Sequence, residues 1–324
     1  MRMLKVRRPV VIFSNGLGDH LVNLPALRAL ASLFPGRLAL ICETGAHQTF
    51  FSGLHFRDVC EVEMEISGKG KLFDAETVAA RLAPCDLLLS LNPWHSPSVD
   101  RLMELFRHPP SIGFFPPFDT TLERDFSKHS AKLAFDVPLT LDASLRIEDF
   151  TAPPEIPREF QRQAERILNS LPANARVLTL HVDTQPEKMW PRPKFHRLLD
   201  RFLTRHPHFH ALILGLDDQG LEQALASDRV ISYCNEVPKA TALSLVSKSS
   251  LFLGVDSFFL HAADLFRIPG VALFGPTDPV EWGFLVAPGK HISANGSMKA
   301  VKVNDVLSAM ESVLEEEKLR SASA

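Results

Sequence analysis

Residues 251–283, LFLGVDSFFLHAADLFRIPGVALFGPTDPVEWG, decide the predicted fold of this chain. The stretch contains an apolar strand, a polar loop, a short helix, a second apolar strand and another loop. In an open α/β sheet, this order brings polar side chains together at the carboxyl ends of neighbouring strands. These side chains are Asp256, Ser257, His261 and Thr277–Asp278. Phosphates and nucleotides bind at such edges, so the stretch predicts a ligand-binding edge.

One helix-to-strand pattern occurs in each half of the chain. Residues 27–45 and 195–218 both run from an amphipathic helix through a proline-containing break into an apolar strand that ends on an acidic residue. Near-continuous apolar strands are typical of parallel sheets that helices cover on both faces. Further strands are predicted at 9–13, 86–91, 111–114, 176–182, 230–233, 251–255 and 270–274.

The sequence therefore predicts an α/β protein with two Rossmann-like domains and mostly parallel sheets. We place the domains at 1–155 and 156–324, because the prolines of TAPPEIP (151–157) disfavour regular structure and suit a connector. Whether the terminal helix packs back on the first domain stays open at this point.

Composition excludes several classes of function. The chain has 324 residues, 45% of them hydrophobic, and a formal net charge of −3, which argues against a nucleic-acid partner. No apolar run approaches the roughly twenty residues that span a bilayer. The four cysteines are scattered without a CxxC pair, as expected of reduced thiols in the cytoplasm. We expect a cytoplasmic protein, and peripheral contact of its basic amino terminus with the inner face of the membrane is a further hypothesis.

The first polar loop, in the segment SNGLGDHLVNLPALRAL (14–30), follows the predicted strand 9–13 and opens a helix. Gly16 and Gly18 would let the backbone approach a ligand closely, while the amino-terminal end of the helix attracts an anion. Asp19 lies near the start of that helix. A lone aspartate at such a position more often caps the helix than acts in chemistry, so both interpretations stay open.

Two further loops supply groups suited to a nucleotide. In HVDTQPEKMWPRPKF (181–195), Thr184 offers a hydroxyl and Lys188 a mobile positive charge, and both fit phosphate oxygens. At the end of the apolar strand predicted within 195–218, Asp217 in LILGLDD is placed where an acidic residue binds ribose hydroxyls, although Asp218 could serve equally.

Taken together, these segments resemble the ADP-heptose:lipopolysaccharide heptosyltransferases of glycosyltransferase family nine. The characteristic family segments look like GxGDxxxxLPALRAL, KxWP and DSGxxHxAxxxxxPxxxLFGPTxP. The corresponding stretches of this chain are 16–30, 188–191 and 256–279, in the same order. The resemblance covers most of the chain.

The resemblance implies a GT-B architecture of two facing Rossmann-like domains, with the acceptor bound by the first and the nucleotide sugar by the second. It implies an inverting, metal-independent transfer without a cofactor, from ADP-heptose or a similar donor to a glycolipid or other hydroxyl acceptor such as the lipopolysaccharide inner core. Asp19 matches the proposed general base. The residues that match the donor site are Thr184, Lys188, Asp217, Asp256, Ser257 and His261.

Two segments depart from the family pattern. Phe258 and Phe259 replace the glycine of the donor loop, although their rings could simply pack in the core. Residues 90–95, SLNPWH, replace an acidic-x-Gln-Gly stretch. Cations for an acidic acceptor would then come from surface positions, with Lys69, Lys71, Arg101, Arg107, Lys128 and Lys132 as candidates.

The sequence also bears on metal use and leaves alternatives open. No Asp-x-Asp motif is present, which removes the usual metal-diphosphate clamp of the other major glycosyltransferase fold. One alternative is an enzyme that uses another nucleotide sugar, or a protein or small-molecule acceptor. Another is a non-catalytic nucleotide- or sugar-binding protein.

Overall fold

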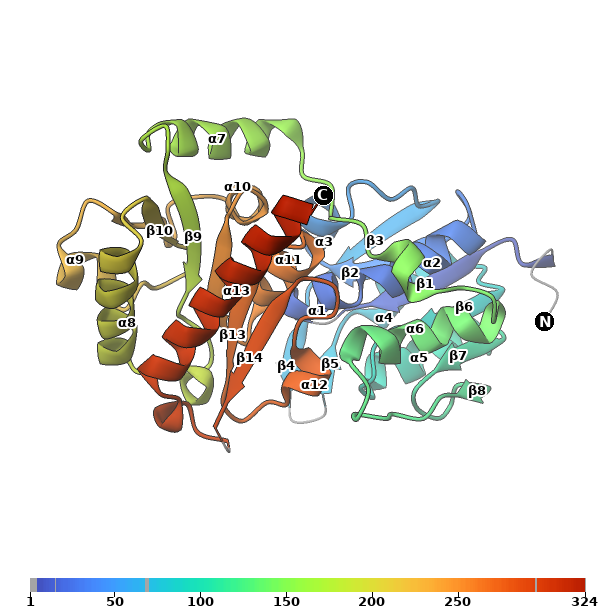
Figure 1. Ribbon diagram of the computed structural model, residues 1–324. Coiled ribbons are helices and arrows are strands. Elements are labelled where there is room, and N and C mark those ends of the chain that lie inside the picture. Colours follow the sequence, from blue (N-terminus) through green and yellow to red (C-terminus); the bar gives the residue numbers. More distant parts are fainter. Residues whose placement is uncertain (1–4, 15, 68–69, 295, 324) are drawn as a thin grey trace. The chain divides into compact units, whose positions relative to one another are not determined.

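The computed structural model describes residues 5–14, 16–67, 70–294 and 296–323 (Figure 1). The chain divides into two compact units, Met1–Glu155 and Ile156–Ala324. Within the described residues, each unit contains one six-stranded sheet, and all strand pairs of both sheets are parallel. The α/β fold predicted from the sequence is confirmed.

The first unit has the strand order β3-β2-β1-β6-β7-β8. Its strands are β1 (Pro9–Phe13), β2 (Ala39–Glu43), β3 (Asp58–Val62), β6 (Leu87–Ser90), β7 (Ser111–Gly113) and β8 (Thr120–Thr121), with a small antiparallel pair β4 (Glu65–Ser67) and β5 (Gly70–Leu72) beside them. Its helices are α1 (Leu17–Val22), α2 (Leu24–Leu33), α3 (Ala46–Phe50), α4 (Ala75–Leu82), α5 (Pro97–Leu105) and α6 (Ser130–Leu141). A 3-10 turn at Ile147–Phe150 precedes the second unit.

Alternating side chains of the first sheet build two cores, because successive residues of a strand point to opposite faces. Val10 and Ile12 of β1 belong to a buried cluster with residues of α4 and α5 such as Val78 and Leu102. Helices α2 and α6 contribute no described residue to that cluster and pack on each other. The first strand is fully buried, as its apolar sequence PVVIF requires.

The second unit repeats the same topology in the order β11-β10-β9-β12-β13-β14. Its strands are β9 (Arg176–His181), β10 (Phe209–Ile213), β11 (Val230–Ser232), β12 (Leu251–Val255), β13 (Gly270–Phe274) and β14 (Gly289–Ser293). Its helices are α7 (Arg158–Asn169), α8 (Arg192–Arg205), α9 (Leu221–Leu225), α10 (Lys239–Ser247), α11 (Phe258–Leu265), α12 (Pro279–Trp282) and α13 (Val303–Ser323), with 3-10 turns at Pro186–Lys188 and Met298–Ala300.

Helices cover both faces of the second sheet (Figure 1). Helix α13 packs on α8 and crosses β13 and β14, whereas α10 packs on α7 and α11. Trp190 is fully buried in the core beneath α13 and donates its Nε1–H to the carbonyl of Val301 at 3.2 Å. This bond fixes the start of α8 and therefore the loop that precedes it, which carries Lys188.

When the strands of each sheet are numbered from 1 to 6 along the chain, both sheets have the order 3-2-1-4-5-6. Each sheet therefore has a topological switch point beside its first strand. The switch points lie between β1 and β6 and between β9 and β12. Ligands of open α/β sheets bind outside the carboxyl ends of the strands at such points. The predicted site residues follow β1, β9, β10 and β12, which places them at these edges.

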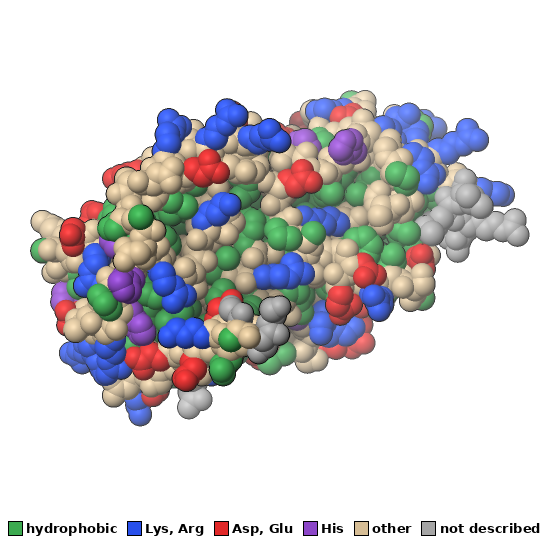
Figure 2. Space-filling model, turned by 45° about the horizontal axis from the view of Figure 1, so that its top comes forward, with side chains coloured by type: hydrophobic (Ala, Val, Ile, Leu, Met, Phe, Trp, Pro, Cys, Tyr) green, Lys and Arg blue, Asp and Glu red, His purple; other side chains and the backbone are tan. Residues whose placement is uncertain are grey.

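Charge and hydropathy on the exterior agree with the composition. Lys and Arg side chains are spread over the face drawn in Figure 2, with Asp and Glu side chains between them. In the described part of the chain, every helix is too short or too polar to cross a bilayer.

Candidate functional site

The carboxyl edge of the second sheet gathers the groups that suit a diphosphate. The Lys188 ammonium lies 2.8 Å from Asp256 Oδ2, and the Thr277 hydroxyl donates to the same oxygen at 2.8 Å. Thr184 donates to the main-chain carbonyl of Asp256 at 3.4 Å. Loops after β9, β12 and β13 therefore meet at one buried carboxylate, since the Asp256 side chain is only 6% exposed.

Asp256 positions the neighbouring groups, because its carboxylate already pairs with a cation and a hydroxyl. Lysine has three N–H donors, and the contact with Asp256 uses one of them. The remaining donors stay available to a ligand while the side chain is held in place. Thr277, which the sequence places at this edge but which is not among the residues that match the family's donor site, belongs to this cluster through its bond to Asp256.

Ser257 is the N-cap residue of α11, and its side chain makes no capping hydrogen bond to the helix. Its backbone is extended, with φ −168°, and its Oγ is buried without a hydrogen-bond partner among the described residues. The amino-terminal end of an α-helix carries a partial positive charge and attracts anions. A buried hydroxyl at this end, next to the Lys188–Asp256 pair, is an unsatisfied polar group that a ligand oxygen would satisfy.

The two phenylalanines at the glycine position of the family pattern lie differently. Phe259 is 6% exposed and packs against His181, with ring centroids 4.8 Å apart. Phe258 is half-buried and contacts Phe259 edge to face. Neither residue is among those with positive φ. The backbone here is therefore one that any residue adopts, and the loop does not need glycine for its conformation.

His261 and Asp278 lie at the same edge, where His261 contacts Trp282 and Asp278 caps a helix. His261 is 3% exposed within α11, and its ring centroid is 6.1 Å from that of Trp282. Asp278 accepts the Val280 N–H at 2.8 Å and caps α12. The structure thus brings Lys188 and Thr277 into direct contact with Asp256.

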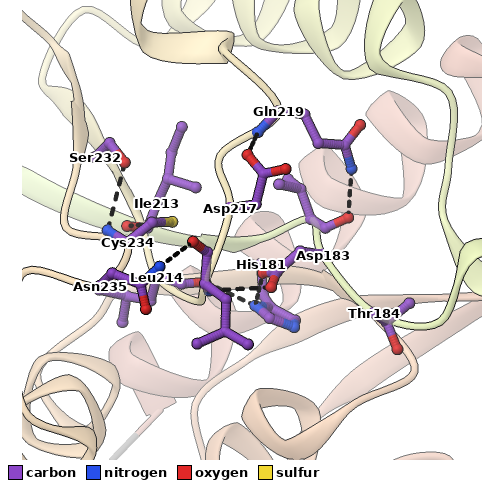
Figure 3. Close-up of polar contacts among 12 residues, drawn as sticks. His181, Asp183, Thr184, Ile213, Leu214, Asp217, Gln219, Ser232, Cys234 and Asn235 are labelled. Carbon is purple, nitrogen blue, oxygen red and sulfur yellow. Dashed lines mark hydrogen bonds and ion pairs between the residues drawn. The ribbon is translucent and has the colours of Figure 1, made fainter.

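The loop after β10 carries two neighbouring aspartates with different contacts, of which Asp217 is labelled in Figure 3. Asp218 uses both carboxylate oxygens to accept backbone N–H groups, those of Gly220 at 2.7 Å and Glu222 at 3.3 Å. Asp217 is exposed and accepts only the Gln219 N–H, at 2.7 Å through Oδ1. Asp217 Oδ2 has no partner among the described residues. Of the two candidates, Asp217 is the one with an oxygen to offer a ribose.

His181, Asp183 and Asn235 form a network behind this loop that sequence reasoning missed. Figure 3 shows His181 beside Asp183 and Leu214. His181 Nδ1 lies 2.7 Å from the Leu214 carbonyl, which only accepts, so Nδ1 carries the proton. Burial lowers the pKa of His181, which keeps the ring neutral. The only available signal was position, because Asp183 and Asn235 each follow the end of a strand.

The carboxyl edge of the first sheet carries Asp19. Asp19 lies in the first turn of α1, and its Oδ2 accepts the Gly16 N–H at 3.0 Å. The capping role that the sequence left open is therefore present. Gly16 is the N-cap residue and Gly18 lies within the helix.

A second contact joins the two loops of the first switch point. Asn92 Nδ2 donates to Ser14 Oγ at 2.9 Å, and Asn92 Oδ1 accepts the Ser14 N–H at 3.2 Å. This pair of bonds ties the loop after β6 to the segment that leads into Asp19. Asn92 belongs to the stretch that replaces the family pattern, and its structural role is to fix that edge.

In the first unit, three aromatic side chains surround Arg124. Trp94 is 49% exposed and stacks on Phe126 with ring centroids 5.8 Å apart. The Arg124 guanidinium lies over three rings, closest to Phe115 at 4.5 Å, and donates to the Pro93 carbonyl at 3.1 Å. We call Trp94, Phe115, Arg124 and Phe126 the aromatic platform.

Several of the predicted cations of the first half already have acidic partners. Arg101 pairs with Glu76 and Glu104, and Lys128 pairs with Asp136 at 2.9 Å. Lys69 lies outside the described residues.

The cysteines are all free thiols. Burial raises the pKa of Cys42 and Cys85 to about 12 and that of Cys234 to about 11. Thiols with such values are not nucleophiles at neutral pH. In the part of the chain that the structure describes, His, Cys, Asp and Glu side chains form no group of three that could hold a metal ion.

Comparison with known structures gives the fold a close precedent. The glycosyl transferase of family 9 from Veillonella parvula superposes with a TM-score of 0.80 at 18% identity, over 96% of this chain and 97% of that one. ADP-heptose lps heptosyltransferase II of E. coli gives 0.71 at 14% identity, over 96% and 99%. E. coli heptosyltransferase WaaC with ADP gives 0.67 at 16% identity, over 94% and 99%. These similarities show that the two units have the GT-B fold.

Sequence comparison identifies the family. Among curated proteins, no sequence is significantly similar to the chain. The sequence model of glycosyltransferase family 9 (heptosyltransferase) matches residues 91–310, which is more than half of the chain. That range includes Lys188, Asp256 and the loops after β9, β12 and β13. The chain therefore belongs to glycosyltransferase family 9, the heptosyltransferase family, and is a glycosyltransferase.

Proposed function

We propose that this enzyme transfers a heptose from an ADP-activated donor to an acceptor hydroxyl, with inversion and without a metal ion. The observation that carries the proposal is the Lys188–Asp256 pair, which lies beside the Ser257 hydroxyl at the start of α11, a group with no hydrogen-bond partner in the described part of the chain. This cluster sits at the switch point of the second sheet, where a nucleotide is expected. The family and the E. coli structure with ADP support the choice of donor.

On the donor side, the cluster would bind the diphosphate. Lys188 would donate its remaining N–H groups to phosphate oxygens, and Ser257 its hydroxyl, next to the positive end of α11. Asp217 would bind the ribose hydroxyls through Oδ2. As the glycosidic bond breaks, negative charge grows on the leaving diphosphate, and fixed donors stabilise that charge without reorganising.

On the acceptor side, Asp19 would act as general base. The acceptor oxygen forms a bond to the anomeric carbon as the bond from that carbon to the diphosphate oxygen breaks. The proton of the acceptor hydroxyl passes to the Asp19 carboxylate, and ADP leaves with the electron pair. The Gly16 N–H, which donates to Asp19 Oδ2, would fix the orientation of the carboxylate.

The acceptor that we propose is an acidic glycolipid of the lipopolysaccharide inner core. Sugar rings stack on exposed indole faces, and a guanidinium binds carboxylate or phosphate. The aromatic platform offers both, through Trp94 and Arg124. The proposal places the reaction in the cytoplasm, with membrane contact through the lipid of the acceptor. Another nucleotide sugar, or a protein or small-molecule acceptor, is the alternative within the same enzyme class.

A non-catalytic nucleotide-binding protein is the alternative from a different class, since Phe258 replaces the family glycine. Calorimetric titration with ADP, together with an assay for hydrolysis or transfer from ADP-heptose, separates the two. We expect ADP binding together with slow ADP release from ADP-heptose, accelerated by a lipopolysaccharide-core acceptor. Binding with neither hydrolysis nor transfer to any acceptor would favour the non-catalytic protein.

Activity should not depend on a divalent cation. The Asp256 carboxylate is already paired with Lys188 and Thr277, and the cluster offers N–H and O–H donors to a diphosphate, whereas Mg²⁺ requires oxygen ligands such as carboxylates. Transfer rates measured with and without EDTA should agree within about twofold, since the donor groups here replace a metal as electrostatic stabilisers. Loss of activity on chelation, restored by added Mg²⁺ or Mn²⁺, would show that the metal-free mechanism is wrong.

A further inference from the structure

Leu216 is the most exposed of the large apolar side chains that the structure describes, at 68%. It lies in the loop after β10, directly before Asp217. A single exposed leucine is common on protein surfaces and needs no explanation by itself. What distinguishes Leu216 is how firmly its main chain is held.

Two side chains from neighbouring loops bind the two polar main-chain groups of Leu216. Its N–H donates to Asp183 Oδ2 at 3.0 Å, and its carbonyl accepts from Asn235 Nδ2 at 2.6 Å. Asp183 follows β9 and Asn235 follows β11, the strands on either side of β10. With both main-chain groups used, Leu216 offers only its apolar side chain to a ligand.

Gly215, Asn235 and His181 hold the backbone around Leu216 in this conformation. Gly215 has φ +147°, and a Cβ at this position would lie 2.0 Å from Asp183 Oδ1, so a side chain here would displace Asp183. Asn235 has φ +58° and donates its own N–H to the Gly215 carbonyl at 3.0 Å. His181 holds the Leu214 carbonyl on the other side. Asparagine adopts this left-handed conformation more readily than most residues with a side chain, so Asn235 suits a position where its amide must reach the Leu216 carbonyl.

The position of Leu216 points to one kind of ligand group. The base of a nucleotide is attached to the ribose carbon next to the 2′-hydroxyl, so a residue adjacent to a ribose-binding carboxylate lies within reach of the base. An apolar side chain without available main-chain groups suits the face of a planar ring rather than its polar edge. We propose that Asp183 and Asn235 are positioning residues that hold Leu216 as the surface on which the donor's nucleobase packs. This inference rests on the proposed donor site at Lys188 and Asp217.

Calorimetric titrations with ADP and with inorganic pyrophosphate test the proposal, because only ADP carries a base. Leu216→Ala should raise the Kd for ADP about 3- to 10-fold through lost apolar contact, while the Kd for pyrophosphate stays unchanged. Leu216→Met, which keeps apolar volume, should stay within about twofold of wild type. Leu319→Ala, at a 65% exposed leucine of α13, is the matched control and should not alter either Kd.

The positioning role is tested by combining variants. Asn235→Gly removes the amide but accepts the positive φ, and it should weaken ADP binding about threefold by releasing the Leu216 carbonyl. In the Leu216→Ala background, Asn235→Gly and Asp183→Ala should each add no further loss, because residues that act through one another are non-additive. Additive losses, or equal losses for pyrophosphate, would show that these residues act only through the stability of the loop.

The controls also separate this inference from the proposed function. If wild-type protein binds neither ADP nor pyrophosphate, the proposed donor site itself is wrong. If wild-type protein binds ADP and Leu216→Ala binds it equally well, the donor site stands and the base-packing role of Leu216 is overturned.

Discussion

Replacing Asp19 with asparagine should reduce kcat for heptosyl transfer by about two to four orders of magnitude, as expected when a general base is lost. The amide oxygen of asparagine can still accept the Gly16 N–H, which Asp19 Oδ2 accepts at 3.0 Å, so the start of α1 should keep its geometry. The variant therefore removes basicity with little change in shape. Steady-state transfer rates and ADP titration measure the two effects separately, and the Kd for ADP should stay near that of wild type.

Asp74 provides a matched control in the same unit. It also caps a helix, because its side chain accepts the Thr77 N–H at 3.1 Å at the start of α4. Asp74→Asn should leave transfer unchanged, since no chemistry is assigned to Asp74. If Asp19→Asn is as active as Asp74→Asn, then Asp19 is only a helix cap and the base must be sought elsewhere.

The elements that the sequence predicted are those with buried, apolar strands. β1, β9, β12 and β13 are completely or almost completely buried, and their apolar runs left little choice of structure. The edge strands β3 and β14 were not predicted. β14 has the sequence GKHIS, and its residues alternate between exposed and half-buried. As an edge strand it has a neighbouring strand on one side only, so more of it stays in contact with solvent. Such a segment resembles a loop when only hydropathy is considered.

The sequence predicts where the site residues lie, but not which of them contact one another. Strand ends placed Thr184, Lys188 and Asp256 at one edge, yet no sequence pattern indicates that Lys188 contacts Asp256, which is 68 positions away. The choice between Asp217 and Asp218 required knowledge of which carboxylate accepts backbone N–H groups. Asp183 and Asn235 were missed because their partners are main-chain groups, which carry no residue-specific signal.

Replacing Lys188 with alanine should raise the Kd for ADP about 10- to 100-fold, the loss expected for one or more charge-assisted hydrogen bonds to phosphate. The same change removes the cation that pairs with the buried Asp256 carboxylate, whose side chain is 6% exposed. Because an unpaired buried charge is destabilising, Lys188→Ala should also lower the midpoint of denaturant unfolding. A weaker Kd alone would therefore not show that Lys188 binds the diphosphate.

The double variant Lys188→Met with Asp256→Asn separates binding from stability. It removes both charges, while the asparagine oxygen can still accept the Thr277 hydroxyl, so the unfolding midpoint should recover toward wild type. ADP affinity should remain as low as in Lys188→Ala, because the ammonium that we propose binds phosphate is still absent. Lys248→Ala, at the exposed lysine that directly follows α10, controls for the loss of one positive charge in the same unit. Recovery of ADP affinity together with stability would mean that Lys188 only neutralises Asp256, and the diphosphate would then depend on Ser257 and the start of α11.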